Sequence, residues 1–270
     1  MLVKRILVVI LLLPIGIAAI LLGGWVYTAL IAMILGLAGW EFAQLFKAGG
    51  LQPARWLVIG GILALTIGRY TNGFASADWL LSLCVLLAMT HHLVDFERGR
   101  QSAASDFAAT LAIIFYIGWI GAYLISLRNL EQGMWWVLLV MPATWFADSG
   151  AYFIGSRFGR HKLSPRLSPH KSWEGYLAGI VWGIAGGALL AWLWQILGAD
   201  PKVITIERGL LVGLVMGVFP TLGDLGESMI KRQVGVKDSS HLLPGHGGFF
   251  DRIDSWLWAA VLGYYLIIWL

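Results

Sequence analysis

The chain has 270 residues, of which 59% are hydrophobic and 13% are charged, whereas soluble domains carry about 25% charged residues. The mean hydropathy of +0.77 and the long apolar runs exclude an ordinary soluble globular protein and indicate a membrane protein. The net charge of +4 does not indicate a nucleic-acid partner, because Lys and Arg also set the orientation of a membrane protein. The single cysteine, Cys84, excludes an internal disulfide and a multi-cysteine metal site.

The apolar segments predict an all-α polytopic protein, since a membrane-spanning helix needs ~20 mostly apolar residues. The predicted spans cover approximately residues 4–22, 24–46, 54–70, 76–94, 106–127, 133–156, 173–197, 207–232 and 249–270. The first span follows Lys4 and Arg5 as a signal peptide would, but it lacks a small-x-small cleavage site and is predicted to be retained. We expect about nine transmembrane helices in a single membrane domain of residues 1–270, with N-terminal helices over about 1–130 and catalytic helices over about 131–270.

The distribution of Lys and Arg predicts the orientation. With the N-terminus in the cytoplasm, fifteen of the 19 Lys and Arg fall on the cytoplasmic side and four on the other. This asymmetry follows the positive-inside rule. Nine of the fifteen lie in or beside two polar connections, residues 156–172 and 231–248, both predicted to be cytoplasmic. A simpler interpretation of these positive charges is that they anchor the chain to anionic lipid.

Carboxylates occur inside the predicted spans, where each costs ~3 kcal/mol on insertion scales and is a functional candidate by default. Asp148 lies near the end of the sixth span, Asp224 and Glu227 lie toward the end of the eighth, and Asp251 and Asp254 open the ninth. In the predicted topology, all of them lie in the cytoplasmic third of the membrane.

The spacing of these acids predicts shared helical faces. Asp224, Glu227 and Ser228 are spaced i, i+3, i+4, and Asp251 and Asp254 are spaced i, i+3. Carboxylate oxygens of this kind suit Mg²⁺, which is usually held by one or two carboxylates together with substrate phosphates. The alternative for each acid is a salt bridge to a nearby Lys or Arg.

Two helix starts are candidate phosphate-binding sites. Residues 244–248, Pro-Gly-His-Gly-Gly, precede the ninth span, and glycines let backbone N–H groups approach an anion at a helix N-terminus. Lys231 and Arg232 lie upstream of this loop. The seventh span begins after Lys171, which offers a second point charge at a helix start.

The sequence around these residues resembles a known family. Residues from Ser228 to Asp254 read SMIKRQVGVKDSSHLLPGHGGFFDRID, and they meet every fixed position of the motif of the phosphatidate cytidylyltransferase (CDP-diacylglycerol synthase) family. A second stretch, from Asp148 to Gly175, is similar to that family's other cytoplasmic segment. The N-terminal spans resemble the family only in hydropathy and in Glu41, which follows an Ala-Gly-aromatic turn.

The resemblance implies a dimeric, nine-helix bacterial enzyme of the inner (cytoplasmic) membrane, with its active site facing the cytoplasm. Such an enzyme transfers CMP from CTP to phosphatidate taken from the inner leaflet, and it releases pyrophosphate in phospholipid biosynthesis. It also implies a di-metal centre that needs Mg²⁺, with a monovalent cation (K⁺) as companion. By position, Asp224 and Asp251 correspond to the metal-binding acids, Ser228 to a polar neighbour and Lys171 to a phosphate-binding lysine.

The predicted site follows from these assignments. Asp224, Asp251 and Lys171 are the catalytic candidates, and Asp148, Glu227 and Asp254 are further candidate metal ligands. The predicted substrate-binding residues are Ser228, Lys231, Arg232, Gly245, His246, Gly247, Gly248 and Arg252. The attacking phosphate monoester has a second pKa near ~6 and is largely deprotonated at neutral pH, so no general base is required. His246 is therefore expected to shape the loop or to contact a phosphate.

Other functions fit parts of the pattern. Another CTP-dependent lipid enzyme, such as a polyprenol or dolichol kinase or an ether-lipid cytidylyltransferase, would differ in its products. An ion-coupled transporter also places acids in the membrane, but transporters usually bind near the midplane, often at an inverted repeat. No repeat is visible in this sequence, and its acids crowd one side.

Overall fold

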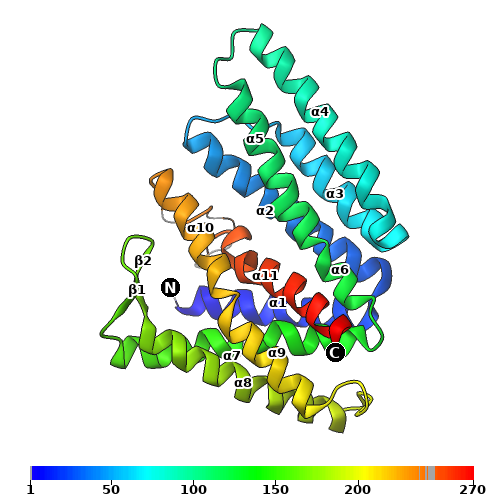
Figure 1. The fold of residues 1–270 in the computed structure, drawn as a ribbon, viewed down its shortest axis with the longest axis vertical. Helices are drawn as coiled ribbons and strands as arrows, with labels where there is room; N and C mark the ends of the chain where they lie inside the picture. The colour runs from blue at the N-terminus through cyan, green and yellow to red at the C-terminus, as the bar shows by residue number, and fades with distance from the viewer. Residues whose placement is uncertain (1, 237, 241, 243–246) are drawn as a thin grey trace. The chain divides into compact units, whose positions relative to one another are not determined.

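The structure, a computed structural model, describes residues 2–236, 238–240, 242 and 247–270 (Figure 1). The chain divides into two compact units. Unit 1 consists of Met1–Ser126 with Ile230–Ile253, and unit 2 consists of Leu127–Met229 with Asp254–Leu270. The boundaries fall inside helices, so that α6, α10 and α11 each begin in one unit and end in the other.

Unit 1 contains the N-terminal helices of the chain. In chain order they are α1 (Leu2–Leu22), α2 (Gly24–Ala48), α3 (Arg55–Asn72), a 3₁₀ turn η1 (Gly73–Ser76), α4 (Ala77–Glu97), α5 (Ala103–Ile113), a π-helical segment η2 (Ile114–Trp119) and the start of α6 (Tyr123–Arg128).

Unit 2 contains the helices that follow and a small hairpin. They are α7 (Gly133–Phe158), the strands β1 (Lys162–Ser164) and β2 (Ser168–Ser172), α8 (Trp173–Ile196), α9 (Ile206–Val218), most of α10 (Thr221–Gln233) and most of α11 (Phe250–Trp269). The strands pair antiparallel, with Lys162 opposite Ser172 and Ser164 opposite Ser168. This hairpin occupies the polar connection 156–172, which the sequence predicted only as a loop.

All nine predicted segments are helical. The fifth is divided into α5, η2 and α6, and the eighth is divided into α9 and α10. The second division falls at Pro220, which has no N–H to donate to the preceding turn. Asp224 consequently lies in the first turn of α10 rather than deep inside one long helix.

Six helical stretches of the described residues are long and apolar enough to cross a membrane: Gly24–Ala48, Arg55–Glu97, Ala103–Arg128, Gly133–Phe158, Trp173–Ile196 and Ile206–Gln233. The chain is therefore a helical, polytopic membrane protein. The number of nine spans and the cytoplasmic N-terminus stay predictions.

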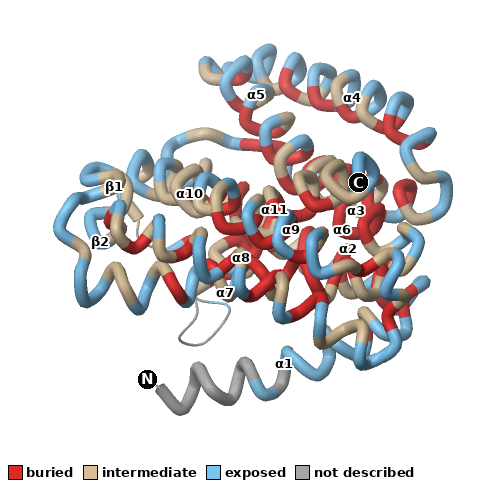
Figure 2. Tube along the Cα trace, turned by 60° about the horizontal axis from the view of Figure 1, so that its bottom comes forward, coloured by how far each residue is buried: buried red, intermediate tan, exposed pale blue. Residues whose placement is uncertain are grey.

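The helix surfaces agree with a lipid environment. In α4 the buried residues Ala77, Leu80, Cys84, Ala88 and His92 recur every three or four positions and form one stripe. The rest of the helix is largely exposed, as Figure 2 shows, and it includes large apolar side chains such as Leu86, at 66% exposure. Soluble proteins rarely leave such apolar surface uncovered, whereas lipid tails would cover it.

Glycines bring α8 and α9 into backbone contact. Gly179, Gly183 and Gly187 on α8 and Gly209, Gly213 and Gly217 on α9 repeat at intervals of four residues. A Cβ added at Gly183 would lie 2.7 Å from the carbonyl oxygen of Gly213, and one added at Gly213 would collide with the carbonyl oxygen of Gly183. Small residues at this spacing are typical of close helix pairs in membranes. The pair fixes the start of α8, which follows Lys171, relative to the end of α9, which leads to Asp224.

We expect Gly213→Ala to destabilise this helix pair by about 1–3 kcal/mol, because a methyl group has no room against the backbone of α8. A lower thermal midpoint of the purified protein in detergent would report the loss. Gly60→Ala is the matched control, since its Cβ would meet no described atom within 4 Å and alanine favours a helix. Equal midpoints for the two variants would contradict the backbone contact.

Candidate active site

The Asp224 carboxylate in unit 2 is paired with a lysine. Lys171 Nζ lies 2.5 Å from Asp224 Oδ2, and the hydroxyl of Ser228 donates to Asp224 Oδ1 at 3.3 Å. Neither partner of the ion pair is deeply buried, because the side chains are 26% and 39% exposed. Part-exposed pairs of this kind contribute only about 0–1 kcal/mol to folding. The pair is thus accessible to a ligand and is of little importance for stability.

Further carboxylates surround Asp224 within the same unit. Asp148 on α7 lies close enough to Lys171 and Asp224 for their charges to act on it. Asp254 on α11 interacts electrostatically with Asp148 and Asp224, and it shares a side-chain hydrogen bond with Glu227 of α10. The structure thus brings together the four acids that the sequence predicted on the sixth, eighth and ninth segments. The predicted lysine lies beside them.

The position of Lys171 follows from the hairpin and from the cap of α8. Lys171 is the fourth residue of β2, and the next residue, Ser172, caps α8 by accepting a hydrogen bond from Gly175 N at 3.2 Å. Glu174, in the first turn, accepts hydrogen bonds from the backbone N–H groups of Arg160 and His161. The base of the hairpin is therefore fixed to the helix that follows it, and Lys171 is held between them.

The Asp251 carboxylate in unit 1 accepts at least four hydrogen bonds from described residues. Its donors are Lys231 Nζ at 2.7 Å, Ser239 N at 3.0 Å, Ser239 Oγ at 2.7 Å and Gly248 N at 2.7 Å. Asp251 is 7% exposed and Lys231 is 13% exposed, so this pair is much more buried than the pair at Asp224. Asp251 both caps the first turn of α11 and connects it to the end of α10 and to the loop between them.

Glu41 is a buried acid whose role the sequence did not reveal. It has no exposed surface, and it accepts hydrogen bonds from Ser239 Oγ at 3.3 Å, Ser240 Oγ at 2.5 Å and Phe250 N at 2.7 Å. Its position on α2, about 200 residues before these donors, is the reason that spacing could not predict the contact. Glu41 and Asp251 both accept hydrogen bonds from Ser239, and each also accepts a backbone N–H at or just before the start of α11.

The glycine-rich loop is described only in part. Gly245 and His246 lie outside the described residues. Gly247 has φ +77°, and a Cβ there would lie 2.6 Å from Asp251 Oδ2, so both the backbone conformation and the space require glycine. Gly248 donates its N–H to Asp251, and no substrate is needed to explain that contact. Arg232 and Arg252, two further predicted substrate-binding residues, have exposed side chains.

Both predicted catalytic acids thus form a salt bridge, which was the alternative to metal binding that the sequence left open for them. Lys171 pairs with Asp224 and Lys231 pairs with Asp251, and each lysine was itself a candidate phosphate-binding residue. The shared cation at Asp224 and Asp251 stays a prediction, because these two acids belong to different units.

The residues of unit 2 fit a hard divalent cation by their chemistry. The carboxylates of Asp148, Asp224, Glu227 and Asp254 form one electrostatic group with Lys171, so acids outnumber the lysine. Excess negative charge on oxygen donors favours a cation, and Mg²⁺ prefers this kind of ligand.

Comparison of the sequence with known proteins identifies the family of this chain. The sequence matches the cytidylyltransferase family over residues 3–270. The chain belongs to the cytidylyltransferase family. The match includes the N-terminal helices, which from sequence alone resembled the family mainly in hydropathy, and it confirms the resemblance found in the two motifs.

Similar proteins of this family come from several bacteria, and each bears the name phosphatidate cytidylyltransferase. The relative from Pseudomonas aeruginosa is 36% identical over 100% of this chain and 97% of its own length. The relative from Thermotoga maritima is 34% identical over 87% of this chain and 85% of its own length. The relative from Synechocystis is 31% identical over 92% of this chain and 90% of its own length.

Proposed function

We propose that this chain transfers CMP from CTP to phosphatidate, giving CDP-diacylglycerol and pyrophosphate for phospholipid biosynthesis. The observation that carries the proposal is the match of nearly the whole chain to the cytidylyltransferase family, together with relatives of similar length named for this reaction. The membrane helices agree with a lipid substrate, because acyl chains can stay in the bilayer while the phosphate group reacts.

The difficulty of this reaction is the approach of two polyanions. A phosphate oxygen of phosphatidate attacks the α-phosphorus of CTP, and the bond to pyrophosphate breaks. The attacking oxygen is already mostly deprotonated at neutral pH, since its pKa is near ~6. Positioned positive charges, rather than a general base, are therefore what this chain has to supply.

Lys171 and Lys231 are the proposed suppliers of that charge. Each ammonium group now contacts a carboxylate, Asp224 or Asp251, at 2.5 and 2.7 Å. A lysine is a compact point charge with three donors, so it can bind an arriving phosphate while it turns away from its acid or retains it. Arg232 and Arg252 are exposed and are proposed to assist in binding the phosphates.

We propose that Asp224 and Asp251 bind Mg²⁺, with Asp148, Glu227 and Asp254 as further ligands. When bound, Mg²⁺ would supply neutralisation of phosphate charge. K⁺ is proposed as a companion ion. Activity that persists after chelation of divalent ions, or in buffer free of K⁺, would exclude the respective ion.

The proposed location is the inner membrane, with the N-terminus and the 156–172 and 231–248 connections in the cytoplasm. Single cysteines at Ser156 and Lys202, introduced after replacing Cys84 by Ser, should react with a membrane-impermeant maleimide from opposite sides. Labelling of both from the same side would contradict the topology.

A homodimer is also proposed, and a detergent-corrected mass equal to that of one chain would exclude it.

The function is tested with purified protein in detergent, phosphatidate and Mg²⁺. CTP labelled at its α-phosphate should transfer the label to lipid with release of pyrophosphate, and CTP labelled at its γ-phosphate should not label lipid. The reverse result would identify a lipid kinase. Lack of transfer to phosphatidate, with transfer to an ether lipid or a polyprenol, would identify a different substrate.

We expect Lys171→Met to lower kcat/KM by about 10- to 100-fold, which corresponds to the loss of one charged hydrogen bond to a phosphate. Lys171→Arg should restore part of the rate because it keeps the charge. Lys162→Met is the matched control, since Lys162 lies exposed on the other strand of the hairpin. Kinetics of Lys171→Met equal to wild type would remove Lys171 from the site.

A further inference from the structure

A cavity of about 580 Å³ lies in unit 1, and none of the acids described above lines it. It is formed by the end of α2, the α2–α3 connection, the start of α3 and the end of α4. Its polar and aromatic lining residues are Lys47, Gln52, Arg55, Trp56, His91 and Asp95. The proposed transfer of CMP assigns no role to these residues.

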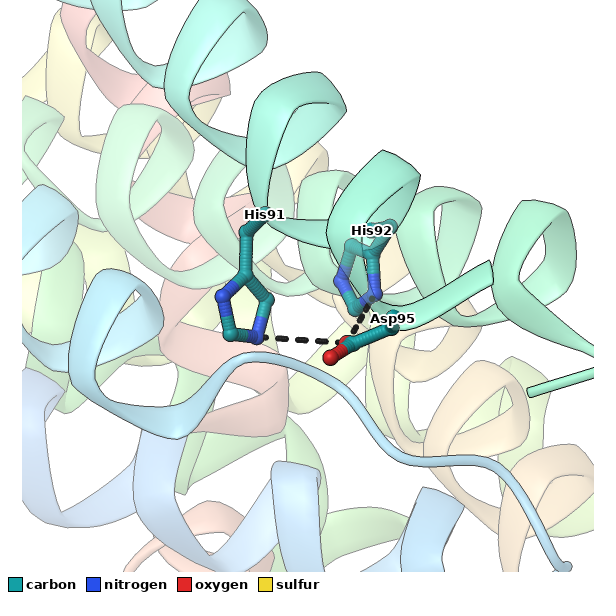
Figure 3. A group of neighbouring side chains, drawn as sticks. All are labelled: His91, His92 and Asp95. Carbon is teal, nitrogen blue, oxygen red and sulfur yellow. Dashed lines mark ion pairs between the residues drawn. The ribbon is translucent and has the colours of Figure 1, made fainter. Parts of the chain in front are cut away.

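Three side chains at the end of α4 converge beside this cavity (Figure 3). One ring nitrogen each of His91 and His92 and one carboxylate oxygen of Asp95 lie within 4.8 Å of one another. Their order in the helix explains this, because Asp95 follows His91 by four residues and His92 by three. His91 Nε2 is 3.4 Å and His92 Nδ1 is 3.2 Å from the same oxygen, Asp95 Oδ2.

The hydrogen bonds of His92 indicate which nitrogen carries its proton. The Thr110 hydroxyl donates to the carbonyl oxygen of Asp106 at 2.8 Å and accepts from Ala54 N at 3.0 Å. Its remaining lone pair can accept from His92 Nε2–H, which is 2.9 Å away. In the neutral ring, Nδ1 is then the nitrogen that carries the lone pair, and it lies 3.2 Å from Asp95 Oδ2.

This arrangement leaves His92 Nδ1 in an unusual position. The side chain is 2% exposed, and Nδ1 has no hydrogen-bond partner among the described residues, although Asp95 Oδ2 is only 3.2 Å away. A buried nitrogen of this kind costs free energy unless something binds it. In a tetrahedral metal site, lone pairs point at the ion rather than at one another. Bonds of 2.0–2.1 Å then separate neighbouring ligand atoms by about 3.4 Å.

We propose that His91, His92 and Asp95 form a binding site for a divalent transition-metal ion of the Zn²⁺ class. Two imidazoles and one carboxylate suit Zn²⁺ and its neighbours in the first transition row, whereas Mg²⁺ prefers oxygen ligands alone. The site is therefore chemically distinct from the carboxylates around Asp224.

Neighbouring residues hold the proposed ligands and the connection beside them in fixed positions. Thr110 holds the outer nitrogen of His92, as second-shell partners of metal-bound histidines do. The ring of Trp56 packs edge-on against His91, with centroids 5.8 Å apart. Asp106 accepts hydrogen bonds from Gln52 N and Arg100 Nε, both at 2.7 Å, which fixes the α2–α3 connection beside the cavity. Three protein ligands leave a fourth position, for which the cavity provides space.

The test measures metal binding by the full-length protein, purified in detergent through a tag that contains no histidine. After chelation and dialysis against Co²⁺ or Zn²⁺ with excess Mg²⁺, we expect one transition-metal ion per chain by elemental analysis. Bound Co²⁺ should show the visible absorption of a four-coordinate site. His92→Gln and Asp95→Asn should each weaken binding by at least about 100-fold, since even outer partners contribute 10- to 100-fold.

The controls separate this site from others and from misfolding. Thr110→Val removes the outer hydrogen bond of His92, together with the hydroxyl's bonds to Ala54 and Asp106, but it removes no proposed ligand. It should weaken metal binding by about 10- to 100-fold. His161→Gln removes a different histidine–carboxylate pair, in which His161 Nδ1 lies 2.6 Å from Glu174 Oε1. Because none of the three proposed ligands belongs to this pair, metal binding should be unchanged. Variants are compared only as monodisperse protein, and Asp95 is part-exposed, so Asp95→Asn keeps the test available if His92→Gln does not fold.

Wild-type protein that retains no stoichiometric transition metal would overturn the proposal and leave an ordinary histidine–aspartate ion pair. Binding that is equally tight in Asp95→Asn and His92→Gln would also overturn it, because the ion would then lie elsewhere. The metal content is measured without reference to CMP transfer, so failure here leaves the proposed enzymatic function untouched.

Discussion

Replacing Asp224 with Asn is expected to lower CMP transfer to phosphatidate by at least about 100-fold, because metal-based stabilisation of phosphoryl transfer contributes several kcal/mol. The folding cost should be small, since Asp224 and Lys171 are 39% and 26% exposed and such pairs add little to stability. Initial rates over a range of Mg²⁺ concentrations, together with the thermal midpoint, would measure both effects. Asp200→Asn is the matched control, because this part-exposed acid lies between α8 and α9 and its carboxylate accepts a hydrogen bond from the backbone N–H of Lys202, not from a lysine ammonium group.

A double variant distinguishes the two explanations for the role of Asp224. If Asp224 serves only to neutralise Lys171, then Lys171→Met in the Asp224→Asn background removes the unpaired charge and should recover activity. If Asp224 binds the cation that the phosphates need, the double variant should be no more active than Asp224→Asn. Recovery to the level of Lys171→Met alone would therefore refute the metal-ligand role.

Hydropathy predicted the helices because burying a backbone in lipid requires a continuous helix of fixed minimum length. All nine segments are helical, with ends that differ by a few residues from those expected. The interruptions were less visible. Pro220 could have predicted the division between α9 and α10, whereas the π-helical turn Ile114–Trp119 lies in an unbroken apolar run without such a signal.

Helix packing was predictable in principle from one pattern. The glycines at 179, 183 and 187 and at 209, 213 and 217 have the four-residue spacing of close membrane helix pairs, and they do meet backbone to backbone. The hairpin β1–β2 was harder to predict, because its short polar strands carry no alternation of apolar residues.

The acids of the site were predictable because charge inside an apolar segment is costly and therefore conspicuous. Asp148, Asp224, Glu227 and Asp254 were expected on one side of the membrane and do form one group in unit 2. Their pairing with particular lysines was left open, since it depends on side-chain geometry. Glu41 was missed as a site residue because its partners lie about 200 residues away, and no local spacing reports such a contact.

Asp251→Asn is expected to abolish activity for a different combination of reasons. The carboxylate of Asp251 accepts from Lys231, Ser239 and Gly248, and an amide would turn one acceptor into a donor that faces other donors. Leaving such groups unsatisfied costs about 1–3 kcal/mol each, so the segment before α11 should loosen. We expect a rate at least about 100-fold lower at every Mg²⁺ concentration. Hydrogen exchange in the peptide containing Ser239 and Ser240 should be faster.

Glu41→Gln separates the structural part of this effect from the chemical part. Glu41 holds the same segment through Ser239, Ser240 and Phe250, yet it is not among the predicted ligands. Its replacement should also speed exchange and lower the maximal rate, but it should leave the Mg²⁺ concentration for half-maximal activity unchanged. If Asp251→Asn shows that same unchanged Mg²⁺ dependence, with a rate that falls only in proportion to exchange, Asp251 is a helix cap and not a metal ligand. The opposite outcome is that both variants show equally fast hydrogen exchange, while Glu41→Gln keeps a measurable rate and Asp251→Asn has almost none. That outcome requires that the Asp251 carboxylate take part in the reaction.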